Sequence, residues 1–451
     1  MWYFPSFSTE TWTLIAILFA LFMWFFDGRL PVMGVMDTAM IKTILVKECY
    51  SVFTNRRDFG LNGELHDAVT IVEDDEWKRI RSTLSPSFTS GRLKDMFKIM
   101  TQHSRNLVKF LQKKVDSDEV LEVKEIFGAY SMDVVASSAF SVDIDSINQP
   151  NDPVITNVKE LLKFNLLNPL LILIVLFPFM RPLLEKCNVS FLPAGVMEFF
   201  YSFLRKIKAE RSKNVHNLMV DSQIPQDHGS KESAHKGLTD HEILSQALTY
   251  IFAGYETSSS TLGFLSYNLA TNPDVQATLQ DEIDQTFPDK APPTYEGLMQ
   301  MEYLDMVINE SLRVYPISSR LERVAKATVE VNGVTIPKGT VVMVPVMTLH
   351  HHPTHWPEPD VFRPERFSKE NRENIDPYTY LPFGIGPRNC IGMRFALQAI
   401  KLVIVEILQS FIFVPCKETE VPLELFDNGF IAPKKPIKLK LVPRAEAPSQ
   451  D

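Results

Sequence analysis

The sequence predicts a mainly α-helical protein with one globular domain behind an N-terminal membrane anchor. Two stretches, about 391–411 and 239–270, carry helical patterning over more residues than a strand would need. The 451 residues are 45% hydrophobic and 22% charged, which is typical of a folded chain with a large core. Length alone would suggest about three domains. Nothing after residue 40, however, resembles a linker long enough to separate two cores.

Charge and cysteine content narrow the classes of partner. The net charge of −9 makes nucleic acid an unexpected partner. The four cysteines show no pairing rhythm, so the sequence predicts no disulfide framework. This pattern fits a reducing location that faces the cytosol.

The first predicted element is an uncleaved membrane anchor within residues 1–29. An apolar run of 15 residues, Trp12 to Phe26, is interrupted only by Thr13. A cleaved secretory signal is the alternative, but no basic segment precedes the run and no small-residue cleavage site follows it. Glu10 before the run and Arg29 after it favour a cytosolic location for the rest of the chain. The aromatic residues that can extend the run through the interface are Trp2, Tyr3, Phe4 and Phe7.

Two helices are predicted next. Met40 to Tyr50 is one, and the acidic run Glu73–Glu76 opens the other, because the helix dipole favours negative charge at its N-terminus. On this second helix Trp77 and Arg81 are one turn apart and share a face. The spacing alone indicates little, since a surface arginine beside a packed tryptophan is common.

A second apolar run, Pro169 to Met180, is too short to cross a membrane and contains Pro178. It is either an interfacial segment or ordinary core, and the sequence does not decide between them. The polar stretch from Pro225 to Lys236 contains glycine, serine and histidine, which predicts a surface loop.

The longest predicted helix begins at the capping box Thr239-x-x-Glu242 and runs to about Ala270, before Pro273. Its middle contains Ala253-Gly254-Tyr255-Glu256-Thr257, followed by further hydroxyl residues. A glycine beside hydroxyl side chains is poor helix material. Local rules that are broken inside a long buried helix indicate function. A simple kink is the alternative, but a kink would not need Glu256 beside Thr257.

Two later patterns are weak by themselves. Glu310 and Arg313 form a helical i, i+3 pair, which is frequent on protein surfaces. A metal cluster at the histidines of 350–355 is disfavoured, because neighbouring residues on an extended chain point to alternating faces and Pro353 ends the run. A strand end followed by a turn is the preferred interpretation.

The most informative stretch is Phe383–Gly392, which reads Phe-x-x-Gly-x-Arg-x-Cys-x-Gly. Its glycines and proline suit an irregular loop that approaches a flat ligand closely. Cys390 precedes a mostly apolar helix, whose N–H groups and dipole favour a thiolate. A thiolate in such a loop can be the axial ligand of haem iron, and Arg388 can meet a haem propionate. An ordinary buried cysteine is the alternative, but a chance match has a probability on the order of 10⁻⁵ per cysteine.

This stretch resembles the haem-thiolate loop of the cytochrome P450 monooxygenases. The resemblance covers about Met40 to Val442, and it is strongest to the vertebrate microsomal family three, subfamily A, whose members oxidise drugs and steroids. Lys47–Arg56 and Gly386–Leu397 are similar to that subfamily nearly residue for residue.

The resemblance implies the cytochrome P450 fold, mainly α with small β-sheets. Residues 30–443 are expected to form the monooxygenase domain and 444–451 a C-terminal tail. The implied cofactor is haem b with Cys390 as the iron ligand. Propionate contacts are expected from Arg56, Trp77, Arg81, Arg323 and Arg388.

The resemblance also implies roles in catalysis and support. Thr257 and Glu256 are expected to organise proton delivery in a groove where a loosened helix leaves room for dioxygen. Glu310, Arg313 and Arg366 are expected to form a buried triad that supports the haem loop. The expected substrate-pocket residues are Phe252, Ala253, Ile317, Ser318 and Leu321.

The implied partners follow from the same resemblance. No nucleotide-binding glycine fingerprint is present, so electrons must come from outside the chain. The expected donor is the NADPH-cytochrome reductase, with microsomal cytochrome b as a further candidate, at the endoplasmic reticulum membrane with the catalytic domain in the cytosol. Lipophilic small molecules are the expected substrates. The basic residues proposed for the reductase-facing side are Lys78, Arg79, Lys94, Arg394 and Lys401.

One departure from the family pattern is expected to matter. Phe26 passes directly to Asp27–Val32, which resembles the far arm of the opening hairpin, so a few dozen residues are expected to be absent as one block. Two alternatives to a monooxygenase therefore stay open. One is a shortened, poorly folded and non-catalytic variant, and the other is a haem-thiolate isomerase that needs no reductase, although the Glu256–Thr257 pair speaks against the isomerase.

Overall fold

The computed structural model describes residues 26–27, 30–161, 168–211, 237–427 and 429–444. The predicted anchor, the predicted loop from Pro225 to Lys236 and the predicted tail lie almost wholly outside the described residues. Within the described ranges, no helix is both long and apolar enough to span a bilayer.

Helices account for most of the regular structure, as predicted. They are α2 Thr38–Lys42, α3 Asp74–Leu84, α4 Ser90–Asp116, α5 Val123–Phe140, α6 Pro153–Leu161, α7 Pro169–Leu176, α8 Arg181–Lys186, α9 Ala194–Arg211, α10 Asp240–Thr271, α11 Pro273–Thr286, α12 Tyr295–Gln300, α13 Glu302–Val314, α14 Val346–His350, α15 Lys369–Arg372 and α16 Met393–Leu408.

The strands are short and form small sheets. They are β1 Phe26–Asp27, β2 Leu30–Gly34, β3 Leu121–Glu122, β4 Leu321–Val324, β5 Val329–Val331, β6 Val334–Ile336, β7 Val341–Val344, β8 Phe411–Pro415, β9 Leu425–Asp427, β10 Ile431–Pro433 and β11 Lys438–Pro443. One sheet has the order β1-β2-β7-β4 and another β3-β11-β8, and β5-β6 and β9-β10 form two-stranded pairs.

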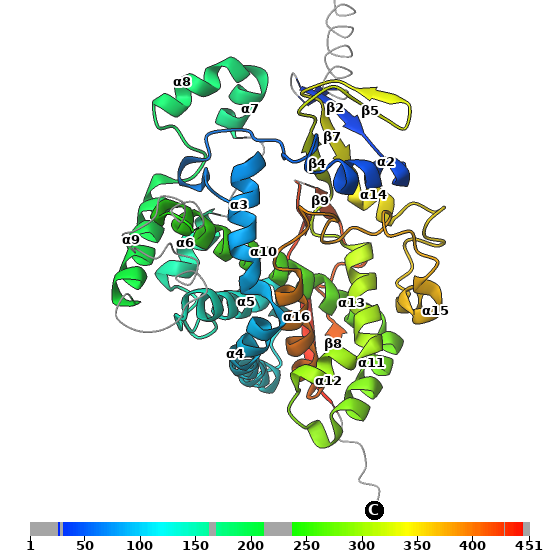
Figure 1. Cartoon of the computed structure of the whole chain (residues 1–451). Coiled ribbons are helices and arrows are strands. Elements are labelled where there is room, and N and C mark those ends of the chain that lie inside the picture. The colour runs from blue at the N-terminus through cyan, green and yellow to red at the C-terminus, as the bar shows by residue number, and fades with distance from the viewer. Residues whose placement is uncertain (1–25, 28–29, 162–167, 212–236, 428, 445–451) are drawn as a thin grey trace, which may run out of the picture.

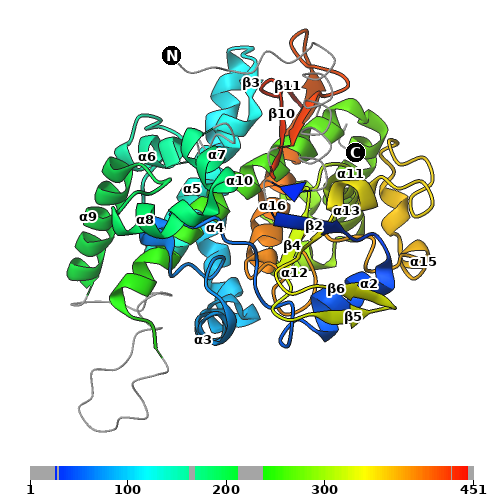
Figure 2. The ribbon, with the colours of Figure 1, turned by 90° about the horizontal axis from the view of Figure 1, so that it is seen from above.

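The elements divide into two sides around α10 and α16. Figures 1 and 2 both show α6, α8 and α9 on one side and β2, β5, α2 and α15 on the other, with α10 and α16 between them. The helix α10 is buried along most of its length. It therefore lies between the two sides and packs against both.

The start and end of α10 agree with the sequence prediction. The Thr239 hydroxyl accepts from the Glu242 N–H at 3.2 Å, and a Glu242 carboxylate oxygen accepts from the Thr239 N–H at 2.7 Å. This capping box satisfies backbone donors that would otherwise lack partners. The helix ends at Thr271, two residues before Pro273.

The middle of α10 does not loosen as the family resemblance implied. The helix is continuous from Asp240 to Thr271, and the hydroxyls of Thr257, Ser259 and Thr261 each donate to the carbonyl four residues earlier. These hydroxyl side chains are compatible with the helical backbone and add hydrogen bonds to the helix. No local break is needed to satisfy them.

Close packing against α5 explains Gly254. A Cβ at Gly254 would lie 2.3 Å from a methyl carbon of Val135 on α5, and a Cβ at Gly128 on α5 would lie 2.9 Å from the Tyr255 hydroxyl oxygen. The two glycines therefore allow α5 and α10 to approach each other more closely than side chains would permit. Gly254 has a packing role that the sequence did not distinguish from a functional one.

Other predicted elements differ at their ends. The helix expected over Met40–Tyr50 is α2 followed by a π-helical turn at Thr43–Lys47. The helix expected to reach Phe411 ends at Leu408, because Phe411 begins β8, which pairs with β11. Helix and strand are both apolar here, so hydrophobicity alone could not place the boundary.

Two alternatives are also resolved. The residues up to His350 form the short helix α14, so the prediction of a strand end there is wrong, and only the turn after it is found.

In the run Pro169–Met180, Leu171 and Ile174 are buried, but Ile172, Phe177 and Phe179 are exposed. This exposure favours an interfacial segment over ordinary core.

The opening hairpin is short. Strand β2 pairs in parallel with β7 from Val32 to Gly34, whereas β1 covers the other edge of β2 only at Leu30 and Pro31. In the described part of the chain, the outer edge of β2 at Val32–Gly34 therefore has no strand beside it. This is the edge that the absent block was expected to cover.

The contact between Gly254 and Val135 predicts the effect of one methyl group. Gly254→Ala should lower the free energy of unfolding by about 1–3 kcal/mol, because the added carbon overpacks the α5–α10 crossing. Denaturant unfolding followed by tryptophan fluorescence would measure this. The matched control is Gly195→Ala on α9, where a Cβ meets nothing within 4 Å. It should be neutral or stabilise by up to about 1 kcal/mol, and equal effects at both glycines would contradict the packing argument.

Candidate active site

The loop that carries Cys390 is fixed by its own backbone. The Cys390 N–H donates to the Phe383 carbonyl at 2.9 Å, and the Asn389 N–H donates to the Gly386 carbonyl at 3.1 Å. Gly386 has a φ of +76°, and a Cβ there would lie 2.1 Å from the Leu45 carbonyl oxygen. Only glycine fits this position. The loop is thereby seated against the turn that follows α2.

Cys390 lies three residues before Met393, the first residue of α16. It keeps accessible surface, although protein atoms surround it closely. Desolvation raises the pKa of the thiol, while the N–H groups of Gly392 and Met393 and the charges of Arg81 and Arg56 oppose the rise. The N–H groups at the helix end favour the thiolate, as predicted, but desolvation is the larger effect and the net pKa shift is upward. A metal ion at the sulfur would be needed to hold the thiolate.

Arginines predicted as propionate contacts gather beside this loop. Arg81 on α3 donates to the Asn389 side-chain oxygen at 3.0 Å, and Arg56 donates to the Arg388 carbonyl at 3.4 Å. The Arg388 guanidinium lies over the Trp77 ring, 4.5 Å from its centroid. The structure thus brings Arg56, Trp77, Arg81 and Arg388 together beside the cysteine loop, and their role as propionate contacts stays a prediction.

Among the described residues, no carboxylate forms an ion pair with these arginines, although the charge of Glu73 acts on Arg388 from a greater distance. Burial, with repulsion from Arg56, lowers the pKa of Arg388 to about 9 and that of Arg323 to about 10. Desolvation also lowers the pKa values of Arg56 and Arg81. Uncompensated buried cations are costly. An anionic ligand at this place would therefore be favoured.

Unpaired donors support the same conclusion. The Nε and Nη1 atoms of Arg388 and the Nε atom of Arg323 are buried and find no hydrogen-bond partner among the described residues. Buried polar groups in folded proteins nearly always have partners. Two carboxylates of a flat, apolar ligand would supply both the acceptors and the negative charge, so the residues present fit a haem group.

The predicted proton-delivery residues lie in the middle of α10. Thr257 is half-buried and donates from Oγ1 to the Ala253 carbonyl at 2.6 Å. The Glu256 carboxylate does not face Thr257. It pairs with Lys124 on α5 at 2.5 Å, and the Ser260 hydroxyl donates to it at 3.4 Å.

The predicted pocket residues separate into two groups. Phe252 and Ala253 lie on the less buried stretch of α10, and the Leu321 side chain lies against Gly384 of the cysteine loop. Ser318 forms an isolated bridge with Phe430, whose ring lies 6.4 Å from that of Phe252. Ile317, in contrast, is only 7% exposed and packs in the main core. It is placed as a core residue and not as a pocket residue.

The predicted triad is present, and two of its three side chains are fully buried. Glu310 pairs with Arg313 through two hydrogen bonds of 2.8 Å, and both side chains are inaccessible to solvent. Arg366 reaches the same carboxylate at 3.3 Å. Arg313 also donates to the carbonyls of His350 and Pro359. The pair that looked ordinary in sequence is the centre of a satisfied buried network.

His350 belongs to the same network. Its Nε2 atom accepts from the Leu381 N–H at 2.8 Å, just before the cysteine loop. Burial lowers the pKa of His350 to about 3, so the ring is neutral at physiological pH. The expectation that these histidines do not form a metal cluster agrees with this structural role of His350.

The basic residues proposed for a reductase-facing surface are only partly available. Lys78, Lys94 and Arg394 are exposed. Lys401 is 4% exposed, donates to the Leu298 carbonyl and pairs with Asp305 at 2.7 Å. Its assignment to a docking surface is therefore wrong. Arg79 is held by Glu242 and by the Gly237 carbonyl.

Sequence reasoning missed three features of this region. Lys124 is the partner of Glu256, and Phe430 faces Phe252. The third is Cys49, whose thiol is buried and interacts with Arg323 and Arg388. Each contact joins residues far apart in sequence, and no local pattern signals them.

Comparisons with known proteins agree with this geometry. The family model described as Cytochrome P450 matches residues 18–441. Cytochrome P450 3A40 of Oryzias latipes is 63% identical over 431 residues, which cover 94% of this chain and 85% of that protein. Cytochrome P450 3A27 of Oncorhynchus mykiss is 60% identical over 453 residues, covering 99% and 87%.

A mammalian relative also reveals a length difference. Cytochrome P450 3A12 of Canis lupus familiaris is 50% identical over 497 residues, covering 98% of each chain. Since 98% of 451 residues is about 442, about 55 positions of that alignment have no residue of this chain. These positions lie within the chain and not at its ends, because the alignment includes nearly all of both proteins.

The buried triad predicts a large response to loss of one charge. Glu310→Gln keeps the shape of the side chain but leaves Arg313 and Arg366 without their carboxylate, so the free energy of unfolding should fall by about 3–5 kcal/mol. Equilibrium denaturant unfolding would measure the change. The matched control is Glu302→Gln, which removes the exposed pair with Lys369 and should cost less than about 1 kcal/mol. Similar losses in both variants would show that the triad does not stabilise the fold as argued.

Proposed function

The chain belongs to the cytochrome P450 family, and from this premise we propose that it is a haem-thiolate monooxygenase of lipophilic substrates. The substrates are steroids, drugs and other xenobiotics, and one atom of O₂ is inserted into them. The cofactor is haem b with the Cys390 thiolate as its only protein ligand. The observation that carries the proposal is the set of buried, partly unpaired arginine donors beside Cys390.

Binding of the cofactor rests on charge and on shape. Haem, when held by a cysteine thiolate, supplies the activation of dioxygen. Arg388 and Arg323 have the free N–H groups for its propionates, and Arg56 and Arg81 add positive charge around the same loop. Gly384 and Gly386, both at positive φ, allow the loop backbone to come close to a flat ligand.

Proton delivery would use the middle of α10. The Glu256 carboxylate is 16% exposed, and its partner Lys124 is 38% exposed, so the ion pair connects the helix to solvent. Rotation of Thr257 about χ1 would release the Ala253 carbonyl and turn its hydroxyl toward the reacting site. Thr257 Oγ1 would then donate a proton at that site. The Glu256 carboxylate would have to leave Lys124 and turn toward Thr257 to return a proton from solvent.

Electrons and membrane contact are assigned to separate surfaces. Lys78, Lys94 and Arg394 are the exposed basic residues proposed to meet the NADPH-dependent reductase, with cytochrome b as a further donor. The exposed apolar side chains of the α7–α8 segment, Ile172, Phe177, Phe179 and Leu183, would dip into the endoplasmic reticulum membrane from the cytosolic side.

A poorly folded, non-catalytic form is a second candidate, because the outer edge of β2 is covered only at two residues. The gap of about 55 positions relative to the dog protein is of the size expected for the absent block. A reductase-independent isomerase is less well supported, since it would not need the solvent-connected Glu256.

The proton-delivery role predicts uncoupling in Thr257→Ala. NADPH consumption with reductase should persist, while product formed per NADPH falls at least about tenfold and peroxide rises, because reduction continues without proton delivery. The matched control is Thr261→Ala, one turn further on, whose hydroxyl makes the same bond to the carbonyl four residues earlier. It should stay coupled. If Thr257→Ala stays fully coupled, the proton-delivery role is wrong and Thr257 only stabilises the helix.

The short hairpin predicts reduced stability. Each buried backbone group left without a partner costs about 1–3 kcal/mol, against a total stability of about 5–15 kcal/mol. This chain should therefore melt at a lower temperature, or retain less haem, than one with the corresponding Oryzias latipes segment inserted before Asp27. The melt would be followed at the haem absorption band in one detergent.

The control for the insertion is a Gly/Ser segment of equal length, which adds chain without adding strands. It should not raise the melting temperature. Equal midpoints and equal haem occupancy in all three proteins would refute the second candidate and leave a fully competent monooxygenase.

A further inference from the structure

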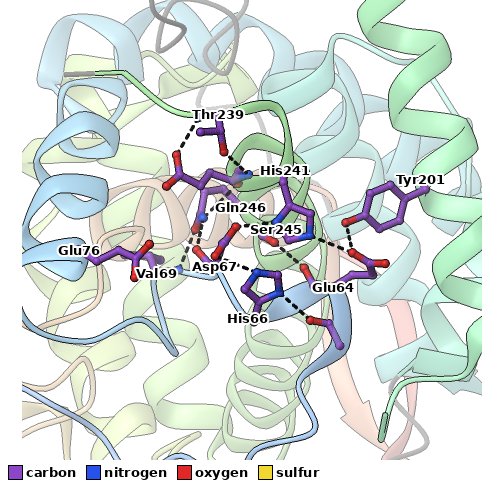
Figure 3. A network of polar contacts seen from close by, with 12 residues as sticks. Glu64, His66, Asp67, Val69, Glu76, Tyr201, Thr239, His241, Ser245 and Gln246 are labelled. Atoms are coloured by element: carbon purple, nitrogen blue, oxygen red, sulfur yellow. Dashed lines mark hydrogen bonds and ion pairs between the residues drawn. The ribbon is translucent and has the colours of Figure 1, made fainter. Parts of the chain in front are cut away.

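We propose that His66, Asp67 and His241 form a binding site for one divalent transition-metal ion, with Zn²⁺ the best match. The three residues come from two separate parts of the chain. His66 and Asp67 follow the short turn Gly63–Leu65, and His241 lies in the first turn of α10. Figure 3 shows their side chains close together. The site does not depend on the proposed monooxygenase function.

The three side chains converge at a distance suited to a metal ion. One ligand atom from each lies within 4.8 Å of the others. Asp67 is central, since its Oδ1 atom is 3.1 Å from Nε2 of His66 and its Oδ2 atom is 2.5 Å from Nδ1 of His241. The two imidazole rings stack with centroids 4.5 Å apart. Two histidine nitrogens and one carboxylate are a frequent ligand set of Zn²⁺.

The opposite nitrogen of each histidine is also held. Nδ1 of His66 bonds to the Gly63 carbonyl at 2.9 Å, and a carbonyl can only accept, so Nδ1 carries a proton. Nε2, which lies 3.1 Å from Asp67, is therefore the nitrogen that a metal ion could take. Nε2 of His241 bonds to Glu64 at 2.9 Å, and that carboxylate accepts from the Tyr201 hydroxyl at 2.6 Å. Metal-binding histidines are usually oriented in this way, by a carbonyl or a carboxylate on the second nitrogen.

Buried contacts fix the backbone that carries Asp67. Gln246 on α10 is fully buried, accepts from the Val69 N–H at 2.8 Å and donates to the Asp67 carbonyl at 2.6 Å. The Ser245 hydroxyl donates to the Glu64 carbonyl. The turn is therefore fastened to α10 on both sides of His66. Preorganisation of this kind lowers the cost of placing the ligands.

The ligand set discriminates between ions. Imidazole nitrogens favour Zn²⁺ over Mg²⁺ and Ca²⁺, which prefer oxygen ligands. The side chains of His66 and His241 are 60% and 33% exposed, so an ion can enter from solvent and keep water in a fourth position. The ion would displace the proton that Nδ1 of His241 shares with Asp67. A metal-free ion-pair cluster is the alternative.

A bound ion would hold together two segments that lead to residues of the candidate active site. The turn Gly63–Leu65 lies between Arg56 and α3, which carries Trp77 and Arg81, and α10 carries Thr257. An ion that binds the folded protein and not the unfolded chain stabilises the fold by mass action. Zn²⁺ should therefore raise the melting temperature.

The test uses the full-length, haem-loaded protein in detergent, freed of metal by chelation and titrated with Zn²⁺ against a zinc-binding dye. One equivalent should bind, and the melting temperature should rise with Zn²⁺. His66→Ala and His241→Ala should each weaken binding at least tenfold and abolish the rise. Mg²⁺ at the same concentration should have no effect. Absence of saturable Zn²⁺ binding would leave the cluster as a set of ion pairs and overturn the proposal.

Two further variants keep the proposal falsifiable. Glu64→Gln removes no ligand and should weaken Zn²⁺ binding by about 10–100-fold through loss of the carboxylate on His241. His355→Ala is the matched control, because His355 is exposed and its ring lies 5.2 Å from that of His352 in another part of the chain. Unchanged binding in His66→Ala and His241→Ala, or loss of binding in His355→Ala, would place the ion elsewhere and refute the assignment.

Discussion

Four arginines from separate parts of the chain surround the loop that ends at Cys390: Arg323 and Arg388 are buried, and Arg56 and Arg81 are half-buried. Buried cations without an ion-pair partner are stable only if an anion binds beside them or if many other contacts hold them in place. The surrounding contacts of this fold meet the second condition. The buried Glu310–Arg313–Arg366 network and His350 fix the chain just before the cysteine loop, and the positive-φ glycines seat the loop on the turn after α2.

The second constraint is the close approach of α5 and α10. Gly254 and Gly128 allow the two helices to pack backbone against side chain, and the same approach brings Lys124 within reach of Glu256. The packing of the fold and the proposed path for protons therefore share one helix crossing. The Glu64–His66–Asp67–His241 cluster ties the N-terminal end of α10 to the segment that leads to α3 (Figure 3). The Lys124–Glu256 pair and the histidine cluster therefore both depend on the position of α10.

Local sequence signals predicted the parts of this account that short stretches determine. The cysteine loop and the capping box at Thr239 are found where the patterns placed them, and the triad is found where the family resemblance implied it. Burial was harder to predict, because Lys401 and Ile317 have polar and apolar side chains that fit several environments, and only packing decides. Lys401 is buried against Asp305, and Ile317 lies in the core. The pairs Lys124–Glu256 and Asp67–His241 join residues 132 and 174 positions apart, so no periodicity reveals them.

The central claim is that the Cys390 sulfur is the protein ligand of haem iron in a pocket built around buried arginines. The most direct measurement is the difference spectrum of the reduced carbon monoxide complex for the full-length protein and for Cys390→Ser. The control is Cys416→Ser, which replaces the half-buried cysteine directly after β8. The account predicts the thiolate-type spectrum in the parent and in Cys416→Ser, and its loss in Cys390→Ser. An unchanged thiolate-type spectrum in Cys390→Ser would contradict it.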